Sequence, residues 1–345
     1  APQCRPSCCA TTLPASVFAA DPILDNQVVP AQFQLPKRSD SASVRKDEES
    51  DDPCTYQGLT MVQAGTSAGA VKKQAIADLP LHGLSAESQQ KVQDVVKGLS
   101  LYRRLPTISF EMDRHVYVYF LKNPDIAVAS WRAMGISKFA LEQTGPGKFH
   151  ADAGDGSVGT IEVLKCTAEE TLIYCEGAFK SPLLTKPIVA RSVMRVETKF
   201  QKEQDGRLIA THHGDVFVEF PSQTVETVAK IISPLSYSVA DRNFKQLTFY
   251  AHMMTMAMAR QPGWVEAVAR RMEEITPQQR EEFLRLSAAS YVAARQRDAV
   301  RTGQPLSLDD VIRPLRVEPA SNSTSRPGGN STPPRIAAQP ESRVK

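Results

Sequence analysis

The chain has 345 residues, of which 41% are hydrophobic and 23% are charged, values that are ordinary for a globular protein. The formal charge of +3 is too small to argue for a nucleic-acid partner. No apolar run approaches the roughly 20 residues needed to cross a bilayer. Six cysteines in a chain of this length do not make a disulfide scaffold. The composition therefore predicts a globular protein that does not span a membrane.

Residues 1–80 are predicted to be a disordered segment, because they are rich in Pro, Ser, Ala and Gln and show little periodicity. This segment holds four cysteines, at Cys4, Cys8, Cys9 and Cys54. Adjacent Cys8 and Cys9, with no histidine nearby, are poor zinc ligands, so we expect no metal. Disulfides and free thiols both stay open. The start at Ala1-Pro2 fits removal of a leader and favours a secreted or periplasmic location.

Ordered structure is expected from about Leu84. A helix runs through one apolar stripe from Ser85 to Tyr102 and ends at Pro106. Ser109–Leu121 alternates as a strand, and Asn123-Pro124 begins a helix that ends at Gly135. Four short strands separated by turn residues follow, at Ile136–Gln143, Lys148–Ala153, Val158–Cys166 and Thr171–Phe179. Such spacing is typical of a meandering antiparallel sheet.

A long hairpin comes next, with strands Pro187–Gln201 and Leu208–Phe220. A three-residue turn closing on Gly206 brings the apolar sets of both strands onto one face. This register places Arg195 opposite Asp215, Arg191 opposite Glu219 and Thr198 opposite His212 on the neighbouring strand. The charged set then lies on a face exposed to water, and His212 points inward.

The apolar face of the sheet needs a cover, and the stretch Ser222–Gln261 is predicted to supply it as a helix kinked at Ser233-Pro234. Its four methionines between Met253 and Met258 suit either a cavity wall or ordinary core packing, and the second is favoured. Residues 264–316 are expected to form a helical appendix that includes a capping box at Thr276–Gln279. A disordered tail is expected over residues 317–345.

This order of elements resembles the helix-grip fold of the START-like superfamily over roughly Leu105 to Gly263. The resemblance implies an α+β fold in which a curved antiparallel β-sheet grips a long C-terminal helix. Together with the helix pattern from Leu84, it predicts a helix-grip domain at residues 84–263, and the extra C-terminal helices and disordered termini lie outside that domain. It also implies an apolar cavity between sheet and helix. Members bind lipids and other apolar ligands, and a minority are cyclases or hydrolases.

The expected cavity lies between the inward side chains of the hairpin and those of the long helix. Its predicted ligand-binding residues are His212, Thr198, Met194, Val196, Val216, Val218, Phe244, Leu247, Ala251 and Met254. His212 is expected to act as a polar anchor or as a general acid or base, with a hydrogen-bonded core histidine as the plainer alternative. His213 faces the other way, so the pair is poorly placed to chelate a metal.

Three functions are consistent with this pattern. The favoured one is non-catalytic binding of an apolar small molecule or lipid, with no cofactor. The second is an enzyme, a cyclase or hydrolase that uses His212. The third is a protein-interaction component whose cavity is filled by side chains. A cavity of roughly 300 Å3 or more would favour binding over the third function. The sequence contains no Ser-His-Asp order, no H-E-x-x-H and no P-loop that would name a reaction.

Overall fold

The computed structural model describes residues 58–179, 188–221 and 234–305. Its strands are β1 Leu59–Gln63, β2 Leu99–Arg104, β3 Thr107–Glu111, β4 Ala140–Gly145, β5 Lys148–Asp152, β6 Val158–Cys166, β7 Glu170–Phe179, β8 Ile188–Lys202 and β9 Leu208–Glu219. Its helices are α1 Gly69–Ala77, α2 Ala86–Lys97, α3 Arg114–Lys122, α4 Pro124–Ala133, α6 Pro234–Arg260, α7 Pro262–Arg271 and α8 Pro277–Thr302.

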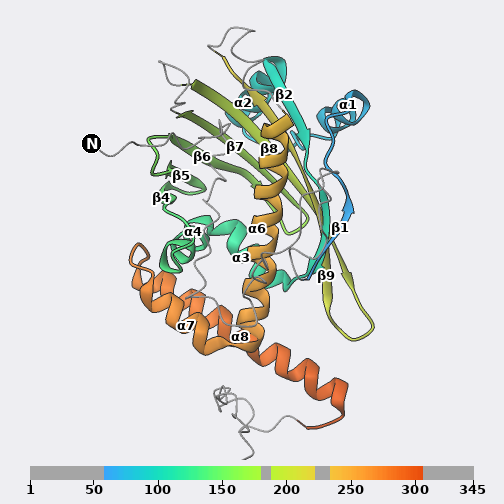
Figure 1. Cartoon of the computed structure of the whole chain (residues 1–345), viewed down its shortest axis with the longest axis vertical. Coiled ribbons are helices and arrows are strands. Elements are labelled where there is room, and N and C mark those ends of the chain that lie inside the picture. The colour runs from blue at the N-terminus through green and yellow to red at the C-terminus, as the bar shows by residue number, and fades with distance from the viewer. Residues whose placement is uncertain (1–57, 180–187, 222–233, 306–345) are drawn as a thin grey trace, which may run out of the picture.

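The described strands form one nine-stranded antiparallel sheet in the order β1-β3-β9-β8-β7-β6-β5-β4, and β2 pairs with β9 beside β3. The sheet is curved, and the long helix α6 lies across one of its faces (Figure 1). The fold is therefore α+β, with the architecture that the sequence predicted. Residues 1–57 and 317–345, for which disorder was predicted, and residues 306–316 of the expected helical appendix lie outside the described residues.

The face of the sheet that packs against α6 is called the inner face below. Met194 and Val196 of β8 and Ala210 of β9 pack there in one core with Phe244 and Met254 of α6. This confirms that the long helix covers the apolar face, as the alternating pattern of the hairpin required. The expected beginning of that helix, Ser222–Ser233, lies outside the described residues.

The predicted register of the long hairpin is confirmed. Thr198 pairs with His212, and Lys202 pairs with Leu208 at the end of the ladder. The turn between them closes with Gly206 at a φ of 84°, in the left-handed region that glycine enters without strain. Because the register holds, even-numbered residues of both strands face inward and odd-numbered residues face outward.

The opposite face of the sheet, called the outer face below, was predicted to be exposed to water, and this is wrong. Val193 of β8 and Phe217 of β9 are fully buried there, together with Tyr102 of β2. Residues of α1 and α2, including Ala75 and Val92, complete this second core. The sheet is therefore covered on both faces, and the odd positions of the hairpin mix apolar with charged side chains.

Three predictions of secondary structure are wrong in part. The segment 58–80 is ordered as β1 and α1 rather than belonging to a disordered segment. The helix that was expected to reach Tyr102 ends at Lys97, with Gly98 as its C-cap, and the chain continues as β2. The predicted strand Ser109–Leu121 ends as β3 at Glu111, and its second half is helix α3.

The helices after α6 pack on the same chain. Val265 and Met272 of the α7 region and Phe283 of α8 belong to the core formed by α6 and the inner face. The capping box predicted at the start of α8 is present, since Thr276 and Gln279 exchange side-chain to backbone hydrogen bonds. The helical appendix is thus continuous with the main core.

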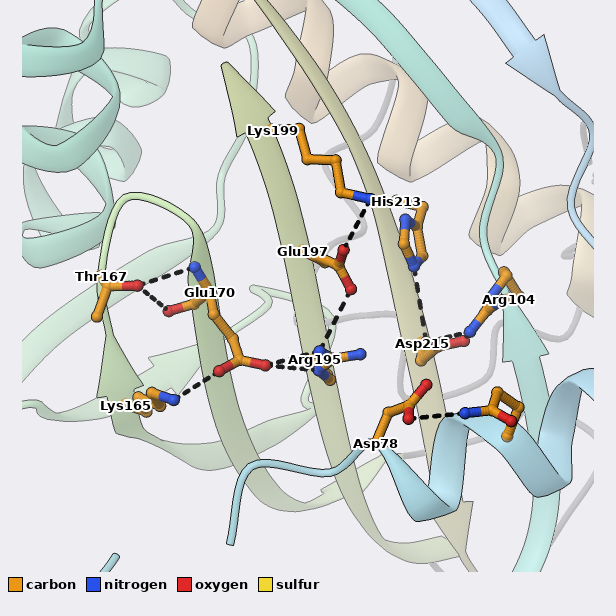
Figure 2. A network of polar contacts seen from close by, with 11 residues as sticks. Asp78, Arg104, Lys165, Thr167, Glu170, Arg195, Glu197, Lys199, His213 and Asp215 are labelled. Atoms are coloured by element: carbon orange, nitrogen blue, oxygen red, sulfur yellow. Dashed lines mark hydrogen bonds and ion pairs between the residues drawn. The ribbon is translucent and has the colours of Figure 1, made fainter. Parts of the chain in front are cut away.

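Charged residues on the outer face form the network shown in Figure 2. The carboxylate of Asp215, only 1% exposed, accepts hydrogen bonds from Arg104 at 2.8 and 2.9 Å and from Tyr102 at 2.6 Å. Arg195 lies opposite Asp215 on the ladder, yet it pairs with Glu170 at 2.7 Å and Glu197 at 3.3 Å. Asp215 thereby ties β2 to β9 through a buried, hydrogen-bonded charge.

Removal of this carboxylate should destabilise the fold. We expect Asp215→Ala to lower the free energy of unfolding by about 3 kcal/mol, because it leaves Arg104 and Tyr102 without their shared partner. Urea denaturation followed by circular dichroism measures this loss. The control is Glu281→Ala, which breaks the exposed pair with Arg285 and should cost far less. Equal losses in the two variants would contradict the role given to Asp215.

Candidate functional site

A cavity of about 210 Å3 lies between the inner face of the sheet and helices α3, α4 and α6. Its wall consists almost entirely of aliphatic and aromatic side chains from these helices and from β4 and β6 to β9. Among the described residues that line it, none is Lys, Arg, Asp or Glu. The cavity is therefore suited to an uncharged apolar molecule rather than to an ion.

Six of the predicted site residues come together around this cavity. They are Met194, Val196, His212, Phe244, Leu247 and Ala251. The hairpin register points the three strand residues toward α6. The helical spacing of Phe244, Leu247 and Ala251 places these three on one side of that helix. The sequence therefore located one side of the cavity.

The other four predicted residues lie outside the cavity wall. Thr198 is buried behind it and hydrogen-bonds the hydroxyl of Tyr117 at 2.7 Å. Val218 packs in a separate cluster near the end of β9, and Val216 contacts both this cluster and the main core. Met254 is fully buried in the core of α6, so the methionine stretch here serves core packing.

The opposite wall of the cavity was missed. It is formed by α3 and α4, through Tyr117, Phe120, Ala127 and Trp131 among others. The error followed from reading α3 as a strand. A helical signal was present, because Asp113 caps the helix and accepts a hydrogen bond from the backbone N–H of His115 at 2.8 Å.

His212 is one of the few polar residues in the cavity wall. It is 5% exposed and lies between two aromatic rings, with centroid distances of 4.8 Å to Phe110 and 4.7 Å to Phe244. Its Nε2 lies 2.8 Å from the hydroxyl oxygen of Thr248 on α6. Its Nδ1 is buried and has no hydrogen-bond partner among the described residues.

The tautomer of His212 follows from the partners of Thr248. The Thr248 hydroxyl donates its one proton to the backbone oxygen of Phe244 at 2.8 Å. It must therefore accept in its bond with His212, so Nε2 carries the ring proton and donates it. Nδ1 is then a bare acceptor, buried without a donor.

Burial lowers the pKa of His212 to about 3, with a smaller contribution from the neighbouring His213. At neutral pH only roughly one imidazole in ten thousand is then protonated. General acid–base catalysis works best when the pKa lies near the operating pH. The environment of His212 therefore favours a neutral hydrogen-bonding group over the general acid or base that the sequence left open.

Apart from His212, the polar side chains discussed here have hydrogen-bond partners within the protein, with one exception. The Tyr250 hydroxyl donates to Ser130 Oγ at 2.7 Å, because the Ser130 proton is donated to the backbone oxygen of Ala127. Burial raises the pKa of Tyr117 to about 12, so its hydroxyl stays neutral beside Thr198. The exception is Trp131, whose buried Nε1 lacks a hydrogen-bond partner within the described ranges.

Cysteines and acidic residues give no metal site in the part of the chain that the structure describes, where no group of three potential ligands occurs. Cys166 and Cys175 are free thiols, and burial raises the pKa of Cys175 to about 12. Cys166 lies opposite Thr171 and Cys175 lies opposite Ile161, so the two thiols do not face each other across this ladder. Cys4, Cys8, Cys9 and Cys54 lie outside the described residues.

Comparisons with known proteins give no family. No family model and no curated protein matches the chain. A conserved protein from Geobacillus kaustophilus is 16% identical with a TM-score of 0.34, over 46% of this chain and 97% of that one. The di-domain ARO/CYC protein BexL of the BE-7585A biosynthetic pathway is 16% identical with a TM-score of 0.23, over 60% of this chain and 59% of that one.

A putative uncharacterized protein from Rhizobium leguminosarum is 13% identical with a TM-score of 0.24, over 42% of this chain and 96% of that one. Identities and TM-scores this low carry no inference about activity. The argument on function therefore rests on the cavity itself. No described helix is both long and apolar enough to cross a membrane.

The buried neutral state of His212 should make stability depend on pH. Between its unfolded pKa of 6.5 and its folded pKa of about 3, the unfolded chain binds a proton that the folded chain does not. Stability therefore falls as pH falls, by up to about 1.4 kcal/mol per pH unit from this residue. In His212→Gln this contribution is absent.

Urea denaturation at a series of pH values measures the effect. The free-energy difference between wild type and His212→Gln should change by about 2 kcal/mol from pH 6 to pH 4, with wild type losing more. All other titrating groups are common to both proteins and cancel in the difference. Parallel curves over this range would show that His212 titrates normally in the folded state.

Proposed function

We propose that this protein binds a compact, uncharged apolar molecule in the cavity between the inner face of the sheet and α6, without a chemical step at His212. The observation that carries the proposal is the cavity of about 210 Å3 with an apolar wall and no charged side chain among its described lining residues. Well-packed cores leave few voids larger than a water molecule. A space of this size is therefore a candidate binding site.

The volume limits the ligand. It falls below the roughly 300 Å3 at the lower end of pockets for drug-sized molecules. An apolar cavity of about 150 Å3 is nevertheless large enough to hold a benzene ring. We therefore propose a ligand the size of one substituted ring, and we do not propose a complete long-chain lipid.

The architecture supports the same function. A curved sheet around a long helix is the arrangement that the sequence resemblance to START-like proteins implied, and in that superfamily the space between the two holds apolar ligands. The cavity of about 210 Å3 does not reach the roughly 300 Å3 that was set as favouring binding over a filled core, so the protein-interaction component stays as the second candidate. Acid–base catalysis is disfavoured by the low pKa of His212.

Filling the cavity should abolish binding. The probe is para-ethyltoluene, a one-ring hydrocarbon, and isothermal titration calorimetry measures its affinity. Ala251 lines the cavity from α6, so Ala251→Phe places a second ring in the space and should weaken binding about tenfold or more. Ala288, exposed on α8, gives the matched control Ala288→Phe, which should bind as wild type does.

Two outcomes would contradict the proposal. One is wild-type protein that binds no probe and releases no small molecule on organic extraction, as followed by native mass spectrometry. The other is binding that Ala251→Phe leaves unchanged. Either result would shift the preference toward a protein-interaction role with a closed core.

A further inference from the structure

The strand β1 is an open edge of the sheet, because it pairs with β3 on one side and with no other described strand on its second side. Figure 1 shows β1 in blue at the outer margin of the sheet. An unpaired strand presents backbone N–H and C=O groups that a further strand can bind. Folded proteins normally protect such an edge with charged side chains, with proline or with a covering segment.

The other open edges of the described sheet carry such protection. β4 is the last strand at the opposite end, and Glu142 places an exposed charge within it. β2 ends with Arg103 and Arg104, and Thr66 forms an antiparallel bridge with Arg104 that covers this end of the strand. β1 contains neither a charged residue nor a proline. It is therefore the edge of the described sheet at which a further strand meets no charge.

The side chains around β1 also favour a contact with another protein chain. Met61 is 39% exposed and Val62 is 59% exposed, and they are two of the four large hydrophobic residues exposed in the described part of the chain. The stretch Gly58–Val71 contains no Asp, Glu, Lys or Arg, although 23% of all residues are charged. Neighbouring exposed apolar side chains are typical of an interaction site. β1 thus combines unpaired backbone groups with apolar side chains that a partner would bury.

The absence of charge favours a second copy of the same chain as the partner. When two copies meet about a two-fold axis, identical patches face each other, so any net charge would face the same net charge. Antiparallel pairing centred on Met61 places Thr60 of one copy opposite Val62 of the other, and no like charges meet. A charged peptide, in contrast, would find no opposite charge on this strand.

We propose that two copies of this chain associate through antiparallel pairing of their β1 strands, which joins the two sheets edge to edge. The contact is small, because β1 has five residues and Val62 has no partner in the ladder with β3. Weak interfaces bury less than about 1,200 Å2, and we expect a dissociation constant on the order of 10 μM. β1 contributes no residue to the described cavity wall, so the inference is independent of the proposed function.

Sedimentation velocity of the full chain, over protein concentrations that span this dissociation constant, tests the association. Val62→Lys removes an apolar side chain and adds a charge beside its own copy, so it should weaken association about tenfold or more. Val158→Lys is the matched control, because Val158 is also exposed but lies on β6, between β5 and β7. This variant should associate as wild type does. Circular dichroism and urea denaturation show that each variant is folded before association is compared.

A mixture of two charge variants gives a second test that is specific to this contact. Val62→Lys and Val62→Glu should each stay monomeric at concentrations where wild type forms dimers. An equimolar mixture of the two should regain dimers, because pairing of their β1 strands then brings opposite charges together. Mixing does not repair a loss of folding or a change at a distant surface, so recovery locates the contact at β1.

A wild type that stays monomeric over the whole concentration range overturns the inference and leaves this edge to a different partner. Dimers that Val62→Lys does not weaken, or that Val158→Lys weakens equally, also overturn it, because the two copies then meet elsewhere. A mixture that fails to regain dimers overturns the pairing of the β1 strands. A loss that is specific to Val62→Lys and that the mixture reverses supports the inference.

Discussion

The register of the β8–β9 hairpin is the constraint on which the rest of the structure depends. Its even positions, including Met194 and His212, face α6, and its odd positions, including Val193 and Asp215, face α1 and α2. A slip of one residue would bury Asp215 against the apolar side of α6 and turn His212 away from the cavity. The left-handed Gly206 at the turn and the two opposed cores all specify the same register.

The outer-face network extends this constraint to the cavity. Asp215 on β9 accepts a hydrogen bond from Arg104, the last residue of β2. After two intervening residues the chain continues as β3, which pairs with the next part of β9. That pairing sets Ile108 opposite His212 and leaves Phe110 beside the imidazole ring. A buried charge on one side of the sheet thus helps to position an aromatic neighbour of the histidine on the other side.

The sequence predicted those parts of the fold that a single periodicity dictates. The hairpin register, β6 and the capping box of α8 each depend on local patterns, and each is confirmed. The missed elements have two patterns at once. Ser109–Leu121 alternates like a strand, yet its second half also has Val116, Tyr117, Phe120 and Leu121 at helical spacing after the cap Asp113. Burial of Phe217 under α2 depends on distant packing, which periodicity does not specify.

The same difference between local patterns and distant packing explains why one side of the cavity was predicted and the other was missed. The side formed by β8, β9 and α6 followed from register, whereas the wall from α3 and α4 required knowing how separate helices meet. His212 is a residue of the cavity wall whose hydrogen bonding is incomplete among the described residues. Its unpaired Nδ1 costs about 1–3 kcal/mol of stability, and a phenylalanine between Phe110 and Phe244 would avoid that cost. Positions that break a packing rule without gain for the fold are where function is expected, and this one lies in a cavity wall.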